Sequence, residues 1–319
     1  MVQNIAIDVD TSSTMTNWLI SIVGPTAIGK TALSIEIADH FNTEILSADS
    51  RQFYKELRIG TAVPKPAELN QIKHHFIHNK SVQENYSVGD FEKEALEWLE
   101  NFFQHNNIIV MVGGSGLYSD AITEGLDDFP DINSEIRKRL VKELDENGLI
   151  ELQQELKTLD PLSYRNIDLQ NPHRVIRALE VTLGSDKPYS AYLNKKKNKR
   201  PFKVMKVGLT ADRNIIYQRI NQRVDKMVQA GLIQEVESLY NKRHLNALNT
   251  VGYKEIFEYL DGNCSLKEAV EEIKKNTRRF AKRQLTWYRK DPDILWFDYQ
   301  TPVDDITHTI NKKLSTYED

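Results

Sequence analysis

The sequence is sparing with cysteine, because its 319 residues include only Cys264. A single cysteine excludes an internal disulfide and a cysteine metal cluster. No apolar run is long enough to cross a bilayer, and the polar residues 1–17 lack the basic start and apolar core of a secretory signal. With 40% hydrophobic and 28% charged residues, the sequence predicts a soluble, globular, cytoplasmic protein with no membrane attachment.

The chain also has no net positive charge, since 46 acidic residues outweigh 42 basic residues and leave a formal charge of −4. Two segments, Lys195–Lys203 and Lys274–Lys290, are nevertheless dense in basic residues. The second has no acidic residue and carries interleaved aromatic side chains. Segregated charge of this kind indicates a polyanion as partner, although a solvated helix face and a lysine-rich loop would give the same pattern.

A glycine-rich motif is the strongest positive signal in the sequence. It consists of Gly24, Pro25, Thr26, Ala27, Ile28, Gly29, Lys30 and Thr31, the complete phosphate-loop pattern G-x-x-x-x-G-K-[ST]. A strand candidate precedes it and a helical pattern follows it, as the motif requires. Main-chain amides and the helix start would face an anion, Lys30 adds a charge, and Thr31 offers a hydroxyl to Mg²⁺. The motif predicts a bound polyphosphate but not its fate.

Strand and helix patterns alternate along most of the chain. The strand candidates are residues 18–23, 44–48, 108–112, 204–209 and 294–297. This alternation around a phosphate loop predicts an α/β fold with a P-loop NTPase-like parallel sheet. Between Asp127 and Arg200 only helical patterns occur, one of them opening at Asn171-Pro172. We therefore expect a flexible extension (1–17), a sheet core with a helical C-terminal part (18–126 and 201–319), and a helical insertion (127–200).

Two more segments follow strand candidates and should lie at the same edge of the sheet as the phosphate loop. Asp49-Ser50-Arg51-Gln52 follows the second candidate, and Gly113-Gly114-Ser115 follows the third. An aspartate in such a place is more commonly a turn or cap residue than a functional one. No strand ends in an aspartate at the usual position of a Mg²⁺-organising residue unless Asp49 takes that role, and no guanine-reading Asn-Lys-x-Asp motif occurs. A signalling GTPase is therefore disfavoured.

Seven motifs together carry a resemblance to a known family. They are Gly24–Thr31, Asp49–Tyr54, Ile59–Pro64, Val112–Tyr118, Arg174–Glu180, Val251–Tyr253 and Ala281–Trp287, in that order. The chain resembles the bacterial tRNA dimethylallyltransferases, also called isopentenyltransferases, from about Trp18 to Phe297. It departs from them at Ser115, where the family usually has threonine. The resemblance implies transfer of the five-carbon group of dimethylallyl diphosphate to the exocyclic amine of the adenosine next to the anticodon, with Mg²⁺.

The same resemblance implies roles for individual residues. The phosphate loop would hold the diphosphate leaving group with Mg²⁺ on Thr31, Arg223 would add a clamp, Asp49 would be the general base, and Ser115 would supply a hydroxyl. The residues expected to contact the tRNA anticodon stem-loop are Asp49, Ser50, Arg51, Gln52, Ser115, Arg137, His173, Arg174, Val175, Ile176, Arg177, Asn249, Thr250, Val251, Gly252, Tyr253 and Lys254. Of these, Ser50, Gln52 and Ser115 would read the edge of an extruded adenine.

Two other functions stay open from the residues alone. A small-molecule kinase would use the same loop, with Asp49 as the base toward a substrate hydroxyl. A non-catalytic, nucleotide-gated RNA-binding module would use the loop and the basic segments without making a product. The phosphate loop also permits ATP binding. The sequence does not fix the oligomeric state, and a monomer is the working expectation.

Overall fold

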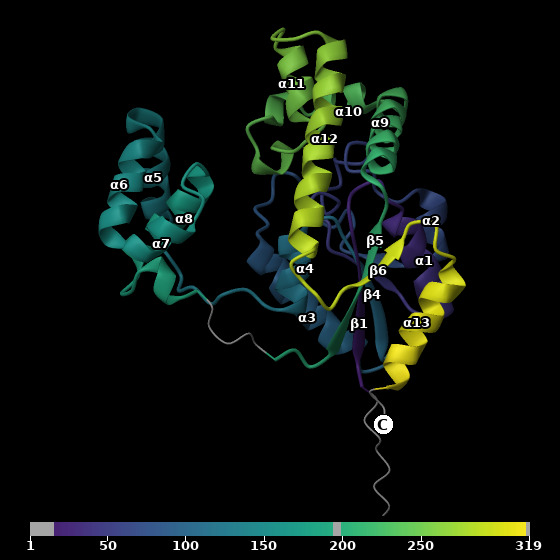
Figure 1. Ribbon diagram of the computed structural model, residues 1–319. Helices are drawn as coiled ribbons and strands as arrows, with labels where there is room; N and C mark the ends of the chain where they lie inside the picture. The colour runs from purple at the N-terminus through teal and green to yellow at the C-terminus, as the bar shows by residue number, and fades with distance from the viewer. Residues whose placement is uncertain (1–15, 194–198, 317–319) are drawn as a thin grey trace, which may run out of the picture. The chain divides into compact units, whose positions relative to one another are not determined.

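The computed structural model describes residues 16–193 and 199–316 (Figure 1). It separates into two compact units, one formed by Met1–Thr123 with Arg200–Asp319 and the other by Glu124–Lys199. These limits differ by a few residues from the expected insertion at 127–200. The expected extension and the lysines at 195–197 lie largely or wholly outside the described residues. Within the described residues, no helix is long and apolar enough to cross a membrane.

A parallel sheet forms the centre of the first unit. Its strands are β1 (Trp18–Val23), β2 (Ile45–Ser47), β3 (His74–His75), β4 (Ile108–Val112), β5 (Lys203–Thr210) and β6 (Leu295–Asp298). Their order is β3-β2-β4-β1-β5-β6, and each pairing is parallel. The structure confirms the predicted α/β class and parallel sheet. Strand β3 was not predicted, because two histidines give no apolar strand signal.

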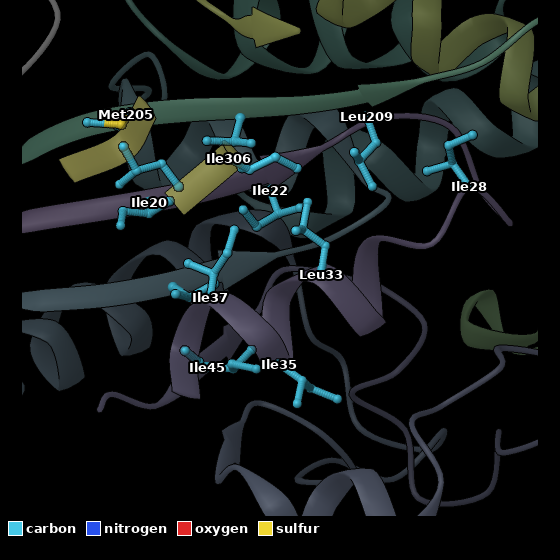
Figure 2. Packing of buried hydrophobic residues seen from close by; sticks show 14 of the residues in the cluster. Ile20, Ile22, Ile28, Leu33, Ile35, Ile37, Ile45, Met205, Leu209 and Ile306 are labelled. Carbon is cyan, nitrogen blue, oxygen red and sulfur yellow. The ribbon is translucent and has the colours of Figure 1, made fainter. Parts of the chain in front are cut away.

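Helices pack on both faces of this sheet. The helices of the whole unit are α1 (Lys30–His40), α2 (Pro66–Gln71), α3 (Val88–Phe102), α4 (Gly116–Thr123), α9 (Arg213–Gln229), α10 (Leu232–Ser238), α11 (Lys254–Leu260), α12 (Leu266–Tyr288) and α13 (Val303–Ser315). Because side chains alternate along a strand, Ile20 and Ile22 of β1 join the cluster containing Ile306 of α13, shown in Figure 2. Leu19 joins the opposite cluster with Phe91 of α3.

A third cluster lies among the helices that follow β5. Val224 of α9, Leu232 of α10 and Ile273 of α12 are buried with Tyr54 and Leu57 from the segment after β2. Helix α12 begins with the predicted capping box, in which the Ser265 hydroxyl accepts a hydrogen bond from the Glu268 amide. This packing ties α9 and α12 to the loops at the carboxyl ends of the strands.

The second unit is wholly helical in its regular structure. Its helices are α5 (Ser134–Asn147), α6 (Leu149–Leu159), α7 (Pro161–Asn166) and α8 (Pro172–Gly184), followed by a short 3₁₀ turn at Tyr189–Ala191. Asn171 caps α8 as predicted, since its side chain accepts from the amides of His173 and Arg174. Where the chain returns to the first unit, the Arg200 guanidinium bonds the carbonyls of Ala121 and Ile122 and pairs with Glu92.

Candidate active site

Three neighbouring strands, β2, β4 and β1, end at one edge of the sheet, and the loops that follow them meet there. The phosphate loop needs its glycines at both ends. Gly24 has φ 138°, and a Cβ there would lie 2.5 Å from the Leu209 carbonyl oxygen. Gly29 has φ 119° and stands directly before α1. These conformations disfavour any side chain, so the loop can curl tightly against β5 and into the helix start.

Lys30 is enclosed by the loop that it follows. Its Nζ donates to the carbonyl oxygens of Gly24 at 3.0 Å and Pro25 at 2.9 Å. Burial, reinforced by the nearby Arg223 and opposed by Asp49, lowers the pKa of Lys30 to about 7. An anion bound at the loop would favour the charged ammonium and raise that pKa again.

Helix α9 places two arginines over the phosphate loop. Arg223 Nη1 donates to Thr26 Oγ1 at 3.2 Å, and Arg219 Nε donates to the Ala27 carbonyl at 2.8 Å. The two residues are four apart, so they share one face of the helix. Burial lowers the pKa of Arg223, and Asp49 opposes that shift. The position of Arg223 suits the predicted clamp, and Arg219 is a second cation that the sequence reasoning missed.

The loop after β2 brings Asp49 beside the glycine loop after β4. Asp49 Oδ1 accepts a hydrogen bond from the Arg51 amide at 3.0 Å. The hydroxyls of Ser50 and Ser115 lie 2.9 Å apart, and the Ser50 amide also donates to Ser115 Oγ at 3.2 Å. A Cβ on Gly113 would lie 2.5 Å from the Ala48 carbonyl oxygen, so only glycine permits this approach.

Two cavities open among these loops, of about 570 and 390 Å³. The first is lined by the phosphate loop with Lys30, Thr31, Gln52, Arg219 and Lys226. The second is lined by Ser50, Arg51, Ser115, Arg283 and part of the 249–254 segment. Thr26, Asp49, Arg223 and Phe280 line both. Asp49 therefore lines both the cavity of the phosphate loop and the cavity that contains the Ser50 and Ser115 side chains.

Two residues expected to contact RNA are engaged in holding loops. Gln52 Nε2 donates to the carbonyls of Thr61 at 3.2 Å and Ala62 at 3.3 Å, and Gln52 lines the first cavity rather than the second. The Arg51 guanidinium donates to the carbonyls of Asn246, Ala247 and Asn249. A sequence motif shows which residues occur together, but not which partners their polar groups take, so RNA contact by these two residues stays a prediction.

The 249–254 segment lines the second cavity through five residues. They are Asn249, Thr250, Val251, Gly252 and Lys254. Tyr253 is fully buried instead, and its hydroxyl donates to Glu235 at 2.6 Å. Burial and Glu235 raise the pKa of Tyr253, which keeps the phenol protonated. The Tyr253 side chain thus supports the cavity wall and is not available to RNA.

The remaining expected tRNA contacts belong to the second unit. His173 and Arg174 are exposed at the start of α8. Arg137 and Arg177 each donate to Glu180 Oε2 at 3.0 Å while staying partly exposed. The side chains of Val175 and Ile176 are 0% and 3% exposed within the core of this unit. Side-chain contact with RNA is therefore wrong for those two residues, because the helical repeat turns them inward.

The structure also reveals a residue that the sequence reasoning missed. The Glu235 carboxylate accepts from the amides of Arg58 at 3.1 Å, Ile59 at 2.8 Å and Gly60 at 3.0 Å, besides the Tyr253 hydroxyl. It thus joins the turn at 58–60, whose Gly60 lines the second cavity, to the 249–254 segment. No sequence signal marks Glu235, which reads as an ordinary helical glutamate.

A family model described as IPP transferase matches residues 52–291. The chain belongs to the IPP transferase family. Relatives named tRNA dimethylallyltransferase include one from Christiangramia forsetii, 57% identical over 95% of this chain and 100% of the relative. Another, from Flavobacterium johnsoniae, is 55% identical over 94% of this chain and 99% of the relative.

Two solved structures extend the comparison to the fold of this IPP transferase. A tRNA isopentenylpyrophosphate transferase from Bacillus halodurans is 35% identical, with a TM-score of 0.71, 94% of this chain and 97% of that chain covered. A eukaryotic dimethylallyltransferase, described as acting on tRNA, is 26% identical, with a TM-score of 0.75, 90% of this chain and 75% of that chain covered. The predicted family is confirmed, and the protein is a transferase enzyme.

The residues present fit a magnesium ion held jointly with a ligand. Thr31 and Asp49 line the first cavity together. Among the described residues, no group of three histidine, cysteine or acidic side chains could hold a metal by itself. Mg²⁺ characteristically takes one or two protein ligands and completes its shell with water and phosphate oxygens. The site therefore suits Mg²⁺ that arrives with a diphosphate.

Proposed function

We propose that this IPP transferase moves the dimethylallyl group of dimethylallyl diphosphate to the exocyclic amine of the adenosine next to the anticodon of tRNA. The observation that carries this proposal is the position of Asp49. It lines both the cavity of the phosphate loop and the cavity of the Ser50–Ser115 pair. A base at that junction faces the donor and the acceptor at once.

On the donor side, the allylic carbon–oxygen bond breaks and negative charge grows on the departing diphosphate. Preorganised cations and amides stabilise such charge more in the transition state than in the ground state. Lys30, Arg223 and the loop amides are the groups present for this task. Mg²⁺, when bound through Thr31, would add positive charge to the same oxygens.

On the acceptor side, the adenine nitrogen forms the new carbon–nitrogen bond and loses a proton. Asp49 accepts that proton, and the Ser50 and Ser115 hydroxyls hydrogen-bond the edge of the base. The adenosine must be extruded from the anticodon loop to reach them, as for other enzymes that act on nucleobases. The products are the N⁶-dimethylallyladenosine in tRNA and diphosphate.

The rest of the tRNA would be held by polar and basic side chains that are at least partly exposed. Those in the second unit are Arg137, His173, Arg174 and Arg177, and those on α12 include Lys282 and Arg283. Phosphate contacts of this kind fix register and orientation without taking part in the reaction. We place the reaction in the cytoplasm, with the protein acting as a monomer.

One assay tests the proposal directly. The protein is incubated with unmodified tRNA, dimethylallyl diphosphate and Mg²⁺, and the digested tRNA is analysed by mass spectrometry for prenylated adenosine. Product should form without ATP. A requirement for ATP hydrolysis, or transfer of radiolabelled phosphate from ATP to a small molecule, would favour the kinase alternative. RNA binding that responds to nucleotide without any product would favour the binding-module alternative.

A further inference from the structure

A single buried amide connects the two loops that meet at the candidate active site. Gln284 of α12 is 4% exposed. Its Oε1 accepts a hydrogen bond from the Thr26 amide at 2.8 Å, and its Nε2 donates to the Gly114 carbonyl at 2.6 Å. Thr26 belongs to the phosphate loop and Gly114 to the loop after β4. Both halves of one side-chain amide are thus used to set the spacing of two loops.

Each loop carries a different part of the proposed chemistry. Besides its bond to Gln284, Thr26 accepts the hydrogen bond of Arg223, the proposed clamp on the diphosphate. Gly114 lies between Gln284 and Asp49, the proposed general base. A Cβ built on Gly114 would be 3.0 Å from Gln284 Nε2 and 3.2 Å from Asp49 Oδ2. Asp49 itself is on the loop after β2, which the loop after β4 approaches closely at Gly113 and Gly114. A shift of the phosphate loop against Gln284 would therefore move the diphosphate, and a shift of the loop after β4 would move Asp49 through this close approach.

The amide is specific to this double contact. A buried polar group without partners destabilises the folded state, so an apolar side chain would be the simpler choice if Gln284 only filled space. Glutamate would keep the acceptor for Thr26 but would set a carboxylate oxygen against the Gly114 carbonyl. Only a side chain with one donor and one acceptor at this reach meets both loops.

We propose that Gln284 is a positioning residue that sets the distance between the diphosphate loop and Asp49; the proposal rests on the transfer reaction given above. It acts through the loops, so its loss lowers the rate of transfer more than it weakens binding of either substrate. Misplacement of reacting groups by about 1 Å costs about 10²-fold in rate. We therefore expect Gln284→Met to lower kcat by roughly 10–10²-fold, with KM for each substrate changed by less than about threefold.

The matched control is Gln229→Met at the end of α9. Gln229 is exposed and is not among the residues that line either cavity. Its kcat should fall much less than that of Gln284→Met. A third variant, Gln284→Glu, keeps the size and the acceptor but loses the donor to Gly114, and should lose kcat as the Met variant does. Equal kcat losses at Gln284 and Gln229, or full activity of Gln284→Glu, would overturn the proposal.

A second measurement does not depend on product formation. Hydrogen exchange followed by mass spectrometry, on the peptide covering 24–31, should be faster in Gln284→Met because the Thr26 amide loses its acceptor. The same peptide in Gln229→Met should exchange as in the wild type. If the wild type forms no prenylated tRNA while this exchange difference is present, the proposed reaction fails, but the link that Gln284 makes between the two loops (the Gln284 bridge) stands. Unchanged exchange with normal product formation would reject the bridge alone.

Discussion

The two cavities of the site are walled in different ways. The phosphate loop takes its shape from neighbouring residues, with Gly24 and Gly29 in left-handed conformations and Lys30 folded back on the loop carbonyls. The wall of the second cavity is held by side chains distant in sequence, such as Glu235 on the turn at 58–60 and Arg51 on the carbonyls at 246–249. A locally shaped loop depends on distant residues only through a few contacts, such as that of Gln284 with the Thr26 amide. The long-range wall depends on such side chains for its shape as a whole.

Substitution of Asp49, which lines both cavities, should have the largest effect on turnover. Asp49→Asn keeps the Oδ1 acceptor for the Arg51 amide but removes the base, so both walls stay in place. We expect turnover to fall by roughly 10²–10⁴-fold, the usual range for a general base. Single-turnover kinetics at saturating tRNA measure this, with tRNA affinity as the control. Near-normal turnover would remove Asp49 from the reaction.

Substitutions in the phosphate-loop wall come next. Lys30→Ala and Arg223→Ala should each lower the transfer rate by roughly 10²–10³-fold, because each removes a cation aimed at developing charge. Affinity for dimethylallyl diphosphate should fall as well, while tRNA affinity changes little. Restoration of either variant by added ATP would contradict the model, since ATP is not consumed in it.

The lowered pKa of Lys30 makes donor binding depend on pH. Near its pKa of about 7, Lys30 is partly neutral, and a bound diphosphate favours the charged form. Affinity should therefore be highest below pH 7 and weaken as pH rises above it. Calorimetry in buffers of different ionisation enthalpy should detect proton uptake on binding at pH 8. In Lys30→Arg, whose guanidinium stays charged, the uptake assigned to this side chain should vanish.

The same shift affects folding, because the unfolded chain has an ordinary lysine with a pKa near 10.5. Between pH 7 and 10.5 the unfolded state keeps a proton that the folded state has lost. The free-energy cost of holding Lys30 in the loop therefore falls as pH rises through this window, and the stability of the folded state increases. The cost is full below pH 7, where Lys30 must stay charged in the folded loop. The melting temperature of Lys30→Met should accordingly lose this part of its pH dependence. A melting temperature that depends on pH as in the wild type would show that Lys30 does not cause the effect.

The long-range wall should yield a smaller and more selective effect. Glu235→Gln removes one carboxylate oxygen and leaves main-chain amides of the turn at 58–60 without a partner, at about 1–3 kcal/mol. We expect the KM for tRNA to rise by about tenfold, with binding of dimethylallyl diphosphate nearly unchanged. The matched control is Glu237→Gln, an exposed position on the same helix. Equal losses of donor and tRNA binding would mean that the two walls are not independent.

The smallest effect is expected at the exposed cations of α12. Lys274 pairs with Asp225 and Glu271, and Arg278 donates to Asn221, so Lys282 and Arg283 are the better candidates for RNA phosphates. Neutralising each should weaken tRNA binding and reduce its salt dependence by about one unit of slope for each phosphate that the side chain no longer reaches. Lys313→Gln on α13 is the control in the same salt titration. Unchanged slopes would indicate a merely solvated helix face.

The local features of the site could be predicted from the sequence. The phosphate loop depends on consecutive residues, and Asp49 follows from the rule that strand ends share an edge of the sheet. Gln284 lay within a recognised motif, but nothing local shows that its amide spans residues 26 and 114. Glu235 had no signal at all. Val175 and Ile176 were predicted to contact RNA because they belong to the same motif as Arg174 and Arg177. The spacing of apolar residues along this helix already indicates that both side chains face the core.

The order of the strands has a consequence for synthesis of the chain. Strand β1 lies between β4 and β5, and the whole second unit comes between these two neighbours in sequence. At about 5–20 residues per second, a ribosome needs roughly 5–20 s to pass from the end of β4 to the end of β5. During that interval the central strand presents an open edge, which is the kind of surface that pairs wrongly with other chains. In the folded protein, Arg200 lies three residues before β5 and hydrogen-bonds the carbonyls of Ala121 and Ile122, so it holds the chain in place where the strand that covers this edge begins.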